Sequence, residues 1–488
     1  MCDPGVVSAP TPSPRTPRLV VGGNDEPHVA RLHRALAEIL ADPLARATSA
    51  VGVEERAMGN GGHRPLLVPI SPHEDPDAVR ADLSRRLDGV PEHADVILRT
   101  SGSTTGTASL VAMSAAALIA SARATHERLD GPGTWVLALP AHHVAGLQVL
   151  VRSIVAGTRP VIVDTTGGFE PGALAAALER TLKTGGPVHV SLVPTQLLRV
   201  LTNSDAAASL ALADAVLVGG AATDPELLRR ARAVRIRVVT TYGMSETGGG
   251  CVYDGVPLGG VRVSVENPDE TGAGRIVLAG PVLAEGYVEA RVPDAGAGRP
   301  DGVARGGAEP RVPDAAAADA AVAQTVPGGA SATGGPPGAP HDGLFRQAIG
   351  AAFFRADPRE FVTADRGRLD ALPDGSTRLT VLGRLDDIIV TGGIKVDPRD
   401  VEQVLTGLPG VAQACVVGVP DRTWGSAVVA AVVPEAGATV DGEGLRRQAR
   451  ERLDSAHAPK RILVVPELPL RGPGKTDRHT VAALCRAV

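Results

Sequence analysis

Short apolar runs alternate with segments of helical apolar spacing over the first half of the chain. The apolar runs predict strands at Asp95–Leu98, Trp135–Leu139, Pro160–Val163, Val188–Val193, Ala215–Val218 and Val234–Thr240. The helical segments lie around and between these runs, at Glu26–Leu40, Asp77–Leu87, Ser114–Leu129, Gly172–Thr184, Thr195–Leu201 and Pro225–Ala233. Alternating strands and helices are typical of an α/β fold with a largely parallel sheet, and we predict this class.

The pattern changes in the second half of the chain. Short strands and turns between Val261 and Val288 predict a small β-subdomain. The stretch Arg291–Gly343 is rich in Gly, Pro, Ala and Asp, and it contains the pentamer Arg-Val-Pro-Asp-Ala twice. Because it has almost no large apolar side chains to offset its ordering entropy, we expect a flexible insertion without catalytic residues.

A second domain is predicted after the Gly-rich segment Gly383–Lys395, because a helix at Pro398–Leu405 and a new α+β pattern follow it. About 100 residues remain there, which is enough for a small separate domain. We therefore expect a disordered tail at 1–17, a large N-terminal α/β domain at 18–385 that includes the insertion at 291–343, and a mobile C-terminal domain at 386–488.

Composition and charge exclude several classes of function. The net charge is −5 and the isoelectric point is about 6.2, so no broad basic field attracts nucleic acid. The four cysteines are far apart and form no CxxC pair, which favours reduced thiols over a disulfide or zinc framework. The N-terminus has no apolar core of a signal peptide, and no apolar run reaches membrane-spanning length, so we expect a soluble cytoplasmic protein.

The loop Thr100–Thr107 contains only Ser, Thr and Gly and follows an apolar strand. Its backbone N–H groups are unobstructed and its hydroxyls can donate, which suits the oxygens of a polyphosphate. No Gly-Lys-Ser/Thr follows, so it is not a Walker loop, and a plain surface linker would have the same composition.

Two more motifs follow strands, where ligands bind in open α/β sheets. Gly219–Ala221 closes one strand with small residues that allow a flat ligand near the backbone, although a simple turn has the same pattern. The run Thr241–Gly249 supplies an aromatic ring, hydroxyls for phosphate oxygens, and the carboxylate of Glu246, which suits Mg²⁺. The alternative is a Gly-rich turn.

Three further positions are candidates. Asp365 lies in a turn and can accept hydrogen bonds from ribose hydroxyls or cap its own turn. The pair His142-His143 follows a strand; adjacent histidines diverge, so a shared metal ion is not expected, and His143 is either a packed residue or one that gates a pocket. Lys475 is one of only four lysines in the chain and lies in a Gly/Pro loop, from which it can reach a phosphate or carboxylate in another domain.

In their order and spacing these motifs resemble those of the adenylate-forming acyl/aryl-CoA ligase superfamily, from about Ile97 to Arg478. Within it, Leu139–Leu150 and Ser191–Leu197 are most similar to the o-succinylbenzoate–CoA ligases of menaquinone synthesis. The resemblance implies an ATP site that consists of Ser101, Gly102, Ser103, Thr104, Thr105, Gly106, Thr107, Gly219, Gly220, Ala221, Tyr242, Gly243, Ser245, Asp365 and Arg384. It also implies that Glu246 binds Mg²⁺, that His143 gates the acyl pocket, that Asp386 is the hinge and that Lys475 is the lysine of the adenylation step.

The sequence departs from the family in the phosphate loop. Ala108-Ser109 stand where the family has Pro-Lys, which removes one cation from the phosphate site, and Arg99 is the candidate to compensate. Ala364 also precedes Asp365 where Gly is usual.

The resemblance implies an ATP-dependent acid–CoA ligase that uses ATP and free coenzyme A as co-substrates and Mg²⁺ as its metal ion. The substrate implied is o-succinylbenzoate. The alternatives are another aryl or fatty acid, a carrier-loading adenylation enzyme, or a non-catalytic relative that only binds ligand. A homodimer is left open.

Overall fold

The computed structural model describes residues 16–48, 65–100, 109–288, 352–373, 375–470 and 475–487. The predicted phosphate loop at 101–107, the predicted insertion at 291–343 and nearly all of the predicted tail at 1–17 lie outside these ranges. None of the helices in the described ranges combines the length and apolar composition needed to span a bilayer.

The predicted α/β class is confirmed. A seven-stranded sheet has the order β11-β10-β9-β8-β7-β5-β6, and its strands β6, β5, β7, β8 and β9 are parallel. Its strands are β5 (Thr134–Leu137), β6 (Val161–Ile162), β7 (Val188–Leu192), β8 (Ala215–Val218), β9 (Val238–Met244), β10 (Gly249–Tyr253) and β11 (Val256–Pro257). Alternate residues of a strand face opposite sides. Trp135 and Leu137 of β5 therefore enter one core and Val136 the other.

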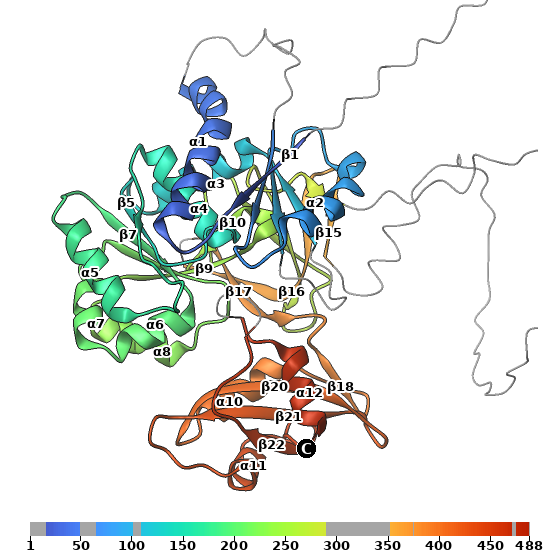
Figure 1. The fold of residues 1–488 in the computed structure, drawn as a ribbon. Helices are drawn as coiled ribbons and strands as arrows, with labels where there is room; N and C mark the ends of the chain where they lie inside the picture. Colours follow the sequence, from blue (N-terminus) through green and yellow to red (C-terminus); the bar gives the residue numbers. More distant parts are fainter. Residues whose placement is uncertain are drawn as a thin grey trace, which may run out of the picture.

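Helices cover both faces of this sheet (Figure 1). The first core contains side chains of α1 (Glu26–Thr48), α3 (Ala115–Arg128) and α4 (Val144–Ala156). The second core contains side chains of α5 (Pro171–Leu182), α6 (Pro194–Leu201), α7 (Ser204–Leu210) and α8 (Pro225–Ala233).

Two further sheets complete this part of the chain. One has the order β1-β2-β3-β4-β14, with β1 (Pro17–Val21), β2 (Leu66–Ile70), β3 (Val96–Arg99), β4 (Leu110–Met113) and β14 (Gly286–Tyr287). Helix α2 (Pro76–Ser84) packs against its core through Val79 and Leu83. The other sheet is antiparallel and consists of β12 (Arg262–Glu266), β13 (Gly274–Ala279), β15 (Phe353–Arg355), β16 (Glu360–Ala371) and β17 (Thr377–Arg384).

The C-terminal part has its own cores. A hairpin of β18 (Ile389–Thr391) and β19 (Ile394–Val396) precedes a three-stranded sheet of β20 (Val411–Asp421), β21 (Gly425–Pro434) and β22 (Arg461–Val464). Helices α10 (Pro398–Thr406) and α11 (Gly442–Arg450) cover one face of that sheet, and α12 (Arg478–Ala487) covers the other. Figure 1 shows this unit beside β17, and the Arg399 guanidinium donates to the Val381 carbonyl there (3.4 Å). The predicted domain boundary at residues 385 and 386 stays a prediction.

One predicted strand begins too early. The run Val234–Thr240 was expected to be extended throughout, but Val234 is the C-cap of α8 and Arg235 has a left-handed φ of 64°. The strand β9 begins only at Val238 and continues to Met244. The apolar pattern did not reveal the helix C-terminus because Val234 and Ile236 continue the apolar run across the turn.

Candidate functional site

The predicted motifs meet at the carboxyl edge of the seven-stranded sheet. His143 follows β5 as the N-cap of α4, Gly219 follows β8, and Tyr242 lies in the second half of β9. Since these strands are parallel members of one sheet, their carboxyl ends lie along the same edge, where ligands bind in open α/β sheets.

Close backbone packing at this edge requires glycine at two of the predicted positions. A Cβ on Gly219 would lie 2.1 Å from Thr241 Oγ1, and a Cβ on Gly243 would lie 2.0 Å from the Gly249 carbonyl oxygen. Both contacts are shorter than real Cβ contacts, so any larger residue forces β8, β9 and β10 apart. These glycines therefore have a packing role in addition to the predicted ligand contact.

A single buried hydroxyl fixes the turn that follows β9. Thr247 is fully buried, and its Oγ1 accepts from the Met244 N–H (3.0 Å) and lies 2.7 Å from the Gly249 carbonyl oxygen. Gly248 closes the turn with a left-handed φ of 59°. This arrangement holds Ser245 and Glu246 at the end of the strand.

Glu246 is oriented by a tyrosine from another sheet. The Tyr287 hydroxyl donates to Glu246 Oε1 at 2.7 Å, and the Tyr287 ring packs edge-on against Phe354 at 5.4 Å between centroids. The Glu246 carbonyl accepts from the Ala284 N–H at 2.8 Å. Among the described residues no group of three or more His, Cys, Asp or Glu side chains could hold a metal ion. Mg²⁺ is commonly held by one or two carboxylates plus substrate phosphates, so the single Glu246 carboxylate fits an ion that a bound nucleotide completes.

Asp365 joins β9 to the antiparallel sheet. The Tyr242 hydroxyl donates to Asp365 Oδ2 at 2.7 Å, and burial together with the Asp365 charge raises the pKa of Tyr242 well above its usual value. Arg384 is the register partner of Asp365 on β17, and its guanidinium lies 3.7 Å from Asp365 Oδ1. The same guanidinium donates two hydrogen bonds to Asp386, at 2.8 and 2.7 Å.

These contacts connect the predicted ribose residues, Asp365 and Arg384, to the predicted hinge residue Asp386 through alternating negative and positive side chains. The hydrogen bonds to Asp386 are the largest cause of the raised pKa of Arg384. Beyond Asp386, the neighbouring Asp387 pairs with Arg478 of α12 at 3.3 Å, which links the start of the C-terminal part to its last helix.

His143 lies near charged groups from both ends of the chain. Burial is the largest cause of its lowered pKa; the positive charge of Lys475 lowers it further, and the negative charge of Glu74 raises it. The neighbouring His142 has its pKa lowered to about 3 by burial and then by His143, and the two rings lie 4.4 Å apart. Lys475 itself is exposed.

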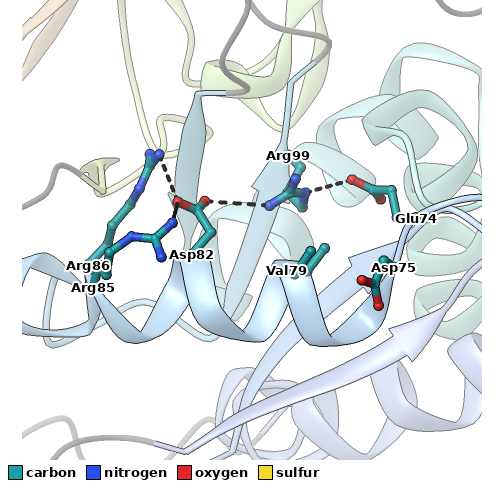
Figure 2. Close-up of a pocket in the computed structure, with 8 residues that line it drawn as sticks. Glu74, Asp75, Val79, Asp82, Arg85, Arg86 and Arg99 are labelled. Carbon is teal, nitrogen blue, oxygen red and sulfur yellow. Dashed lines mark hydrogen bonds and ion pairs between the residues drawn. The ribbon is translucent and has the colours of Figure 1, made fainter.

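Arg99 is already paired with acidic side chains. Its Nε donates to Glu74 at 3.0 Å, and its Nη1 lies 3.9 Å from Asp82, as Figure 2 shows. The pocket drawn there has a volume of about 310 Å³, and Asp82 also pairs with Arg85 and Arg86 at its far end. Because two carboxylates hold Arg99, it is not a free replacement for the lysine that the predicted phosphate loop lacks.

Sequence reasoning missed three residues of this region. Tyr287 and Glu74 act through contacts between elements that are distant in sequence, whereas Thr247 bonds within the run Thr241–Gly249. Scarcity was an available signal for Tyr287: the chain has only three tyrosines, and each one uses its hydroxyl in a hydrogen bond.

Comparisons with known proteins find related sequences over most of the chain. A family model for AMP-binding enzymes matches residues 50–288, and one for the C-terminal domain of AMP-binding enzymes matches residues 400–475. A probable 2-succinylbenzoate–CoA ligase of Mycobacterium tuberculosis is 38% identical over 427 residues, which cover 87% of this chain and 92% of that protein.

Two solved structures have the same fold. ATP-bound MatB from Rhodopseudomonas palustris has a TM-score of 0.63 at 20% identity and covers 97% of both chains. The o-succinylbenzoate CoA synthetase of Bacillus subtilis, in complex with its acyl-adenylate intermediate, has a TM-score of 0.61 at 19% identity and covers 96% of both chains.

The turn after β9 yields a stability prediction. Thr247→Val keeps the side-chain volume but leaves the buried Met244 N–H without its acceptor, so we expect a loss of about 1–3 kcal/mol in the free energy of unfolding. Urea denaturation followed by circular dichroism measures this loss. The control Thr423→Val changes an exposed threonine and should shift the midpoint little. An equal effect of both substitutions would contradict the role of Thr247.

Proposed function

The chain belongs to the family of AMP-binding enzymes, and we propose that it is an ATP-dependent acid–CoA ligase that works through an acyl-adenylate. The observation that carries the proposal is that His143, Tyr242 and Glu246 lie at the carboxyl edge of the sheet and that the Tyr242 hydroxyl donates to Asp365. These residues supply an aromatic face and two carboxylates, and the exposed Lys475 supplies a cation.

The first half-reaction is nucleophilic displacement at phosphorus. A carboxylate oxygen of the acid bonds to the α-phosphorus of ATP, the bond from that phosphorus to the bridging oxygen breaks, and pyrophosphate leaves. The reaction needs positioning and charge neutralisation more than covalent chemistry by the protein. In our proposal Lys475 contacts both the acid carboxylate and the α-phosphate oxygens, and it neutralises the charge that builds up between them.

The nucleotide is held by the residues around Asp365. We propose that Asp365 and Arg384 take the ribose hydroxyls, that Tyr242 and Gly219–Ala221 pack on adenine, and that Ser245 contacts the α-phosphate. Glu246, oriented by Tyr287, would hold Mg²⁺, which supplies charge neutralisation at the phosphate oxygens.

The second half-reaction transfers the acyl group. The CoA thiol attacks the acyl carbon, the bond from that carbon to the phosphate oxygen breaks, and AMP leaves with that oxygen. We propose that the C-terminal part turns about Asp386 between the two steps, which withdraws Lys475 and opens a path for the thiol. The two hydrogen bonds from Arg384 hold Asp386 in the arrangement described, so they must be rearranged in this turn.

The acid we propose is 2-succinylbenzoate. The relative that is 38% identical over 87% of this chain carries the name of a probable 2-succinylbenzoate–CoA ligase, and identity at that level over nearly the full length supports a shared substrate.

The lysine role predicts unequal damage to the two half-reactions. Lys475→Ala should slow adenylate formation about 100-fold or more, because a positioned charge is lost from the transition state. Thioester formation from supplied acyl-adenylate should change little. Pyrophosphate exchange and single-turnover CoA acylation measure the two steps, and Lys183→Ala, an exposed lysine on the end of α5, is the control. Equal loss in both steps would remove Lys475 from this role.

The orientation of Glu246 predicts a specific metal effect. Tyr287→Phe removes one hydrogen bond to a carboxylate, so adenylate formation should fall about tenfold and the Mg²⁺ concentration for half-maximal rate should rise. The matched control Tyr253→Phe removes a hydroxyl that does not contact Glu246 and should leave the Mg²⁺ dependence unchanged. An unaltered Mg²⁺ dependence in Tyr287→Phe would contradict the proposal.

The substrate proposal is tested by CoA-dependent AMP release. We expect kcat/KM for 2-succinylbenzoate to exceed that for benzoate and for fatty acids by about 100-fold or more. A preference for another acid would contradict the proposed substrate but would leave the proposed ligase reaction standing. Measurable ATP binding without AMP release for every acid would indicate a non-catalytic relative.

A further inference from the structure

A buried cationic cluster lies in the first core of the seven-stranded sheet. Arg152 of α4 is only 3% exposed, and its guanidinium lies over the Trp135 ring at 4.9 Å. His189 is the register partner of Trp135 on β7, and the two rings meet edge-on at 5.0 Å. His126 of α3 is a further buried histidine, and burial followed by Arg152 and His189 lowers its pKa to about 4.

One nitrogen of the Arg152 guanidinium begins a chain of hydrogen-bonded hydroxyls. Arg152 Nη2 donates to the Tyr253 hydroxyl at 3.2 Å, and that hydroxyl lies 3.0 Å from Thr125 Oγ1. Thr125 Oγ1 in turn donates to the Ser121 carbonyl at 2.9 Å. Because the Ser121 carbonyl can only accept, the Thr125 hydroxyl donates to it and accepts from the Tyr253 hydroxyl. The Tyr253 hydroxyl in turn accepts from Arg152. The hydroxyls are satisfied, and none of them brings a negative charge.

The charge of Arg152 has no protein counterion in the part of the chain that the structure describes. None of the ion pairs formed there includes this residue. An arginine stays protonated in proteins, and an isolated buried charge is strongly unfavourable. The histidines cannot balance it, because an imidazole is either neutral or positive. Burial is the largest cause of the lowered pKa of both, and the negative charge of Asp214 raises that of His189.

Several buried nitrogens of the cluster, most of them donors, also have no hydrogen-bond partner among the described protein atoms. These are Arg152 Nε, Trp135 Nε1, His126 Nε2 and both ring nitrogens of His189. Arginine and tryptophan nitrogens can only donate, and each neutral imidazole keeps one N–H. A water molecule could accept some of these bonds, but it would leave the arginine charge unbalanced. A small anion satisfies the donors and the charge together.

We propose that this cluster binds a small monovalent anion, such as chloride, between Arg152, Trp135 and the ring nitrogens of His126 and His189. Trp135 and His189 are the second residues of their strands, so the cluster lies toward the amino ends of β5 and β7, away from the edge of the proposed active site. The anion fastens α4 and α3 to the sheet. It stabilises the fold and takes no part in the proposed reaction.

Bromide quenching of Trp135 fluorescence tests the proposal directly. The chain has two tryptophans, so Trp424→Phe leaves Trp135 as the single reporter. The protein is first dialysed into gluconate, a much larger anion than chloride or bromide, and is then titrated with bromide at constant ionic strength. We expect quenching that saturates, and a Tm that is about 2 °C or more higher in chloride or bromide than in gluconate.

The variant Arg152→Met removes the charge from the site and should abolish both effects, whereas Arg123→Met, an exposed arginine of α3, should keep them. If Arg152→Met does not fold, the bromide titration of the Trp424→Phe protein, which keeps Arg152, is sufficient to test the proposal. Quenching that rises linearly without saturation, or equal Tm values in chloride and gluconate, would overturn the proposal and indicate that water satisfies the donors.

Discussion

The hydrogen bond from Tyr242 to Asp365 is the contact through which the two halves of the candidate site depend on each other. Tyr242 belongs to a strand of the parallel sheet and Asp365 to the antiparallel sheet, so this 2.7 Å bond connects two layers with different architecture. Arg384 extends it, since it faces Asp365 across β16 and β17 and holds Asp386 with two hydrogen bonds. In the proposed function, a ribose whose hydroxyls bind the Asp365 oxygens would compete with Tyr242 and alter the charge around Arg384. The proposal therefore links nucleotide binding to the residues at the start of the C-terminal part.

The sequence predicted the part of the fold that depends on local pattern. Strands β7 and β8 are buried on both faces, and both lie where the apolar runs predicted them. Helix α4 was not predicted; its residues from Gly146 to Ser153 are all buried, so the polar Gln148 and Arg152 do not mark an exposed face. The predicted start of β9 was wrong because the apolar residues Val234 and Ile236, on either side of Arg235, made the turn look like part of the strand.

The candidate site was predictable in its motifs and not in its supporting contacts. Most motif residues can be recognised in the sequence because small or hydroxyl-bearing residues directly follow an apolar strand. Lys475 can be recognised because lysine is scarce in this chain. The Tyr287–Glu246 bond depends on β14 pairing with β4, and the Arg99–Glu74 pair depends on α2 packing against β3, which are properties of the assembled fold. Arg152 was hidden for the same reason, since an arginine in a helix gives no sign in the sequence that its side chain is buried.

The central claim is that the acid is activated as an adenylate at this site. Isotope transfer tests it most directly: 2-succinylbenzoate with ¹⁸O in its carboxylates is converted with ATP and CoA, and the nucleotide product is analysed by mass spectrometry. If the carboxylate attacks the α-phosphorus, AMP is formed and carries one labelled oxygen. Formation of ADP with the label in inorganic phosphate, or of AMP without label, would contradict the account.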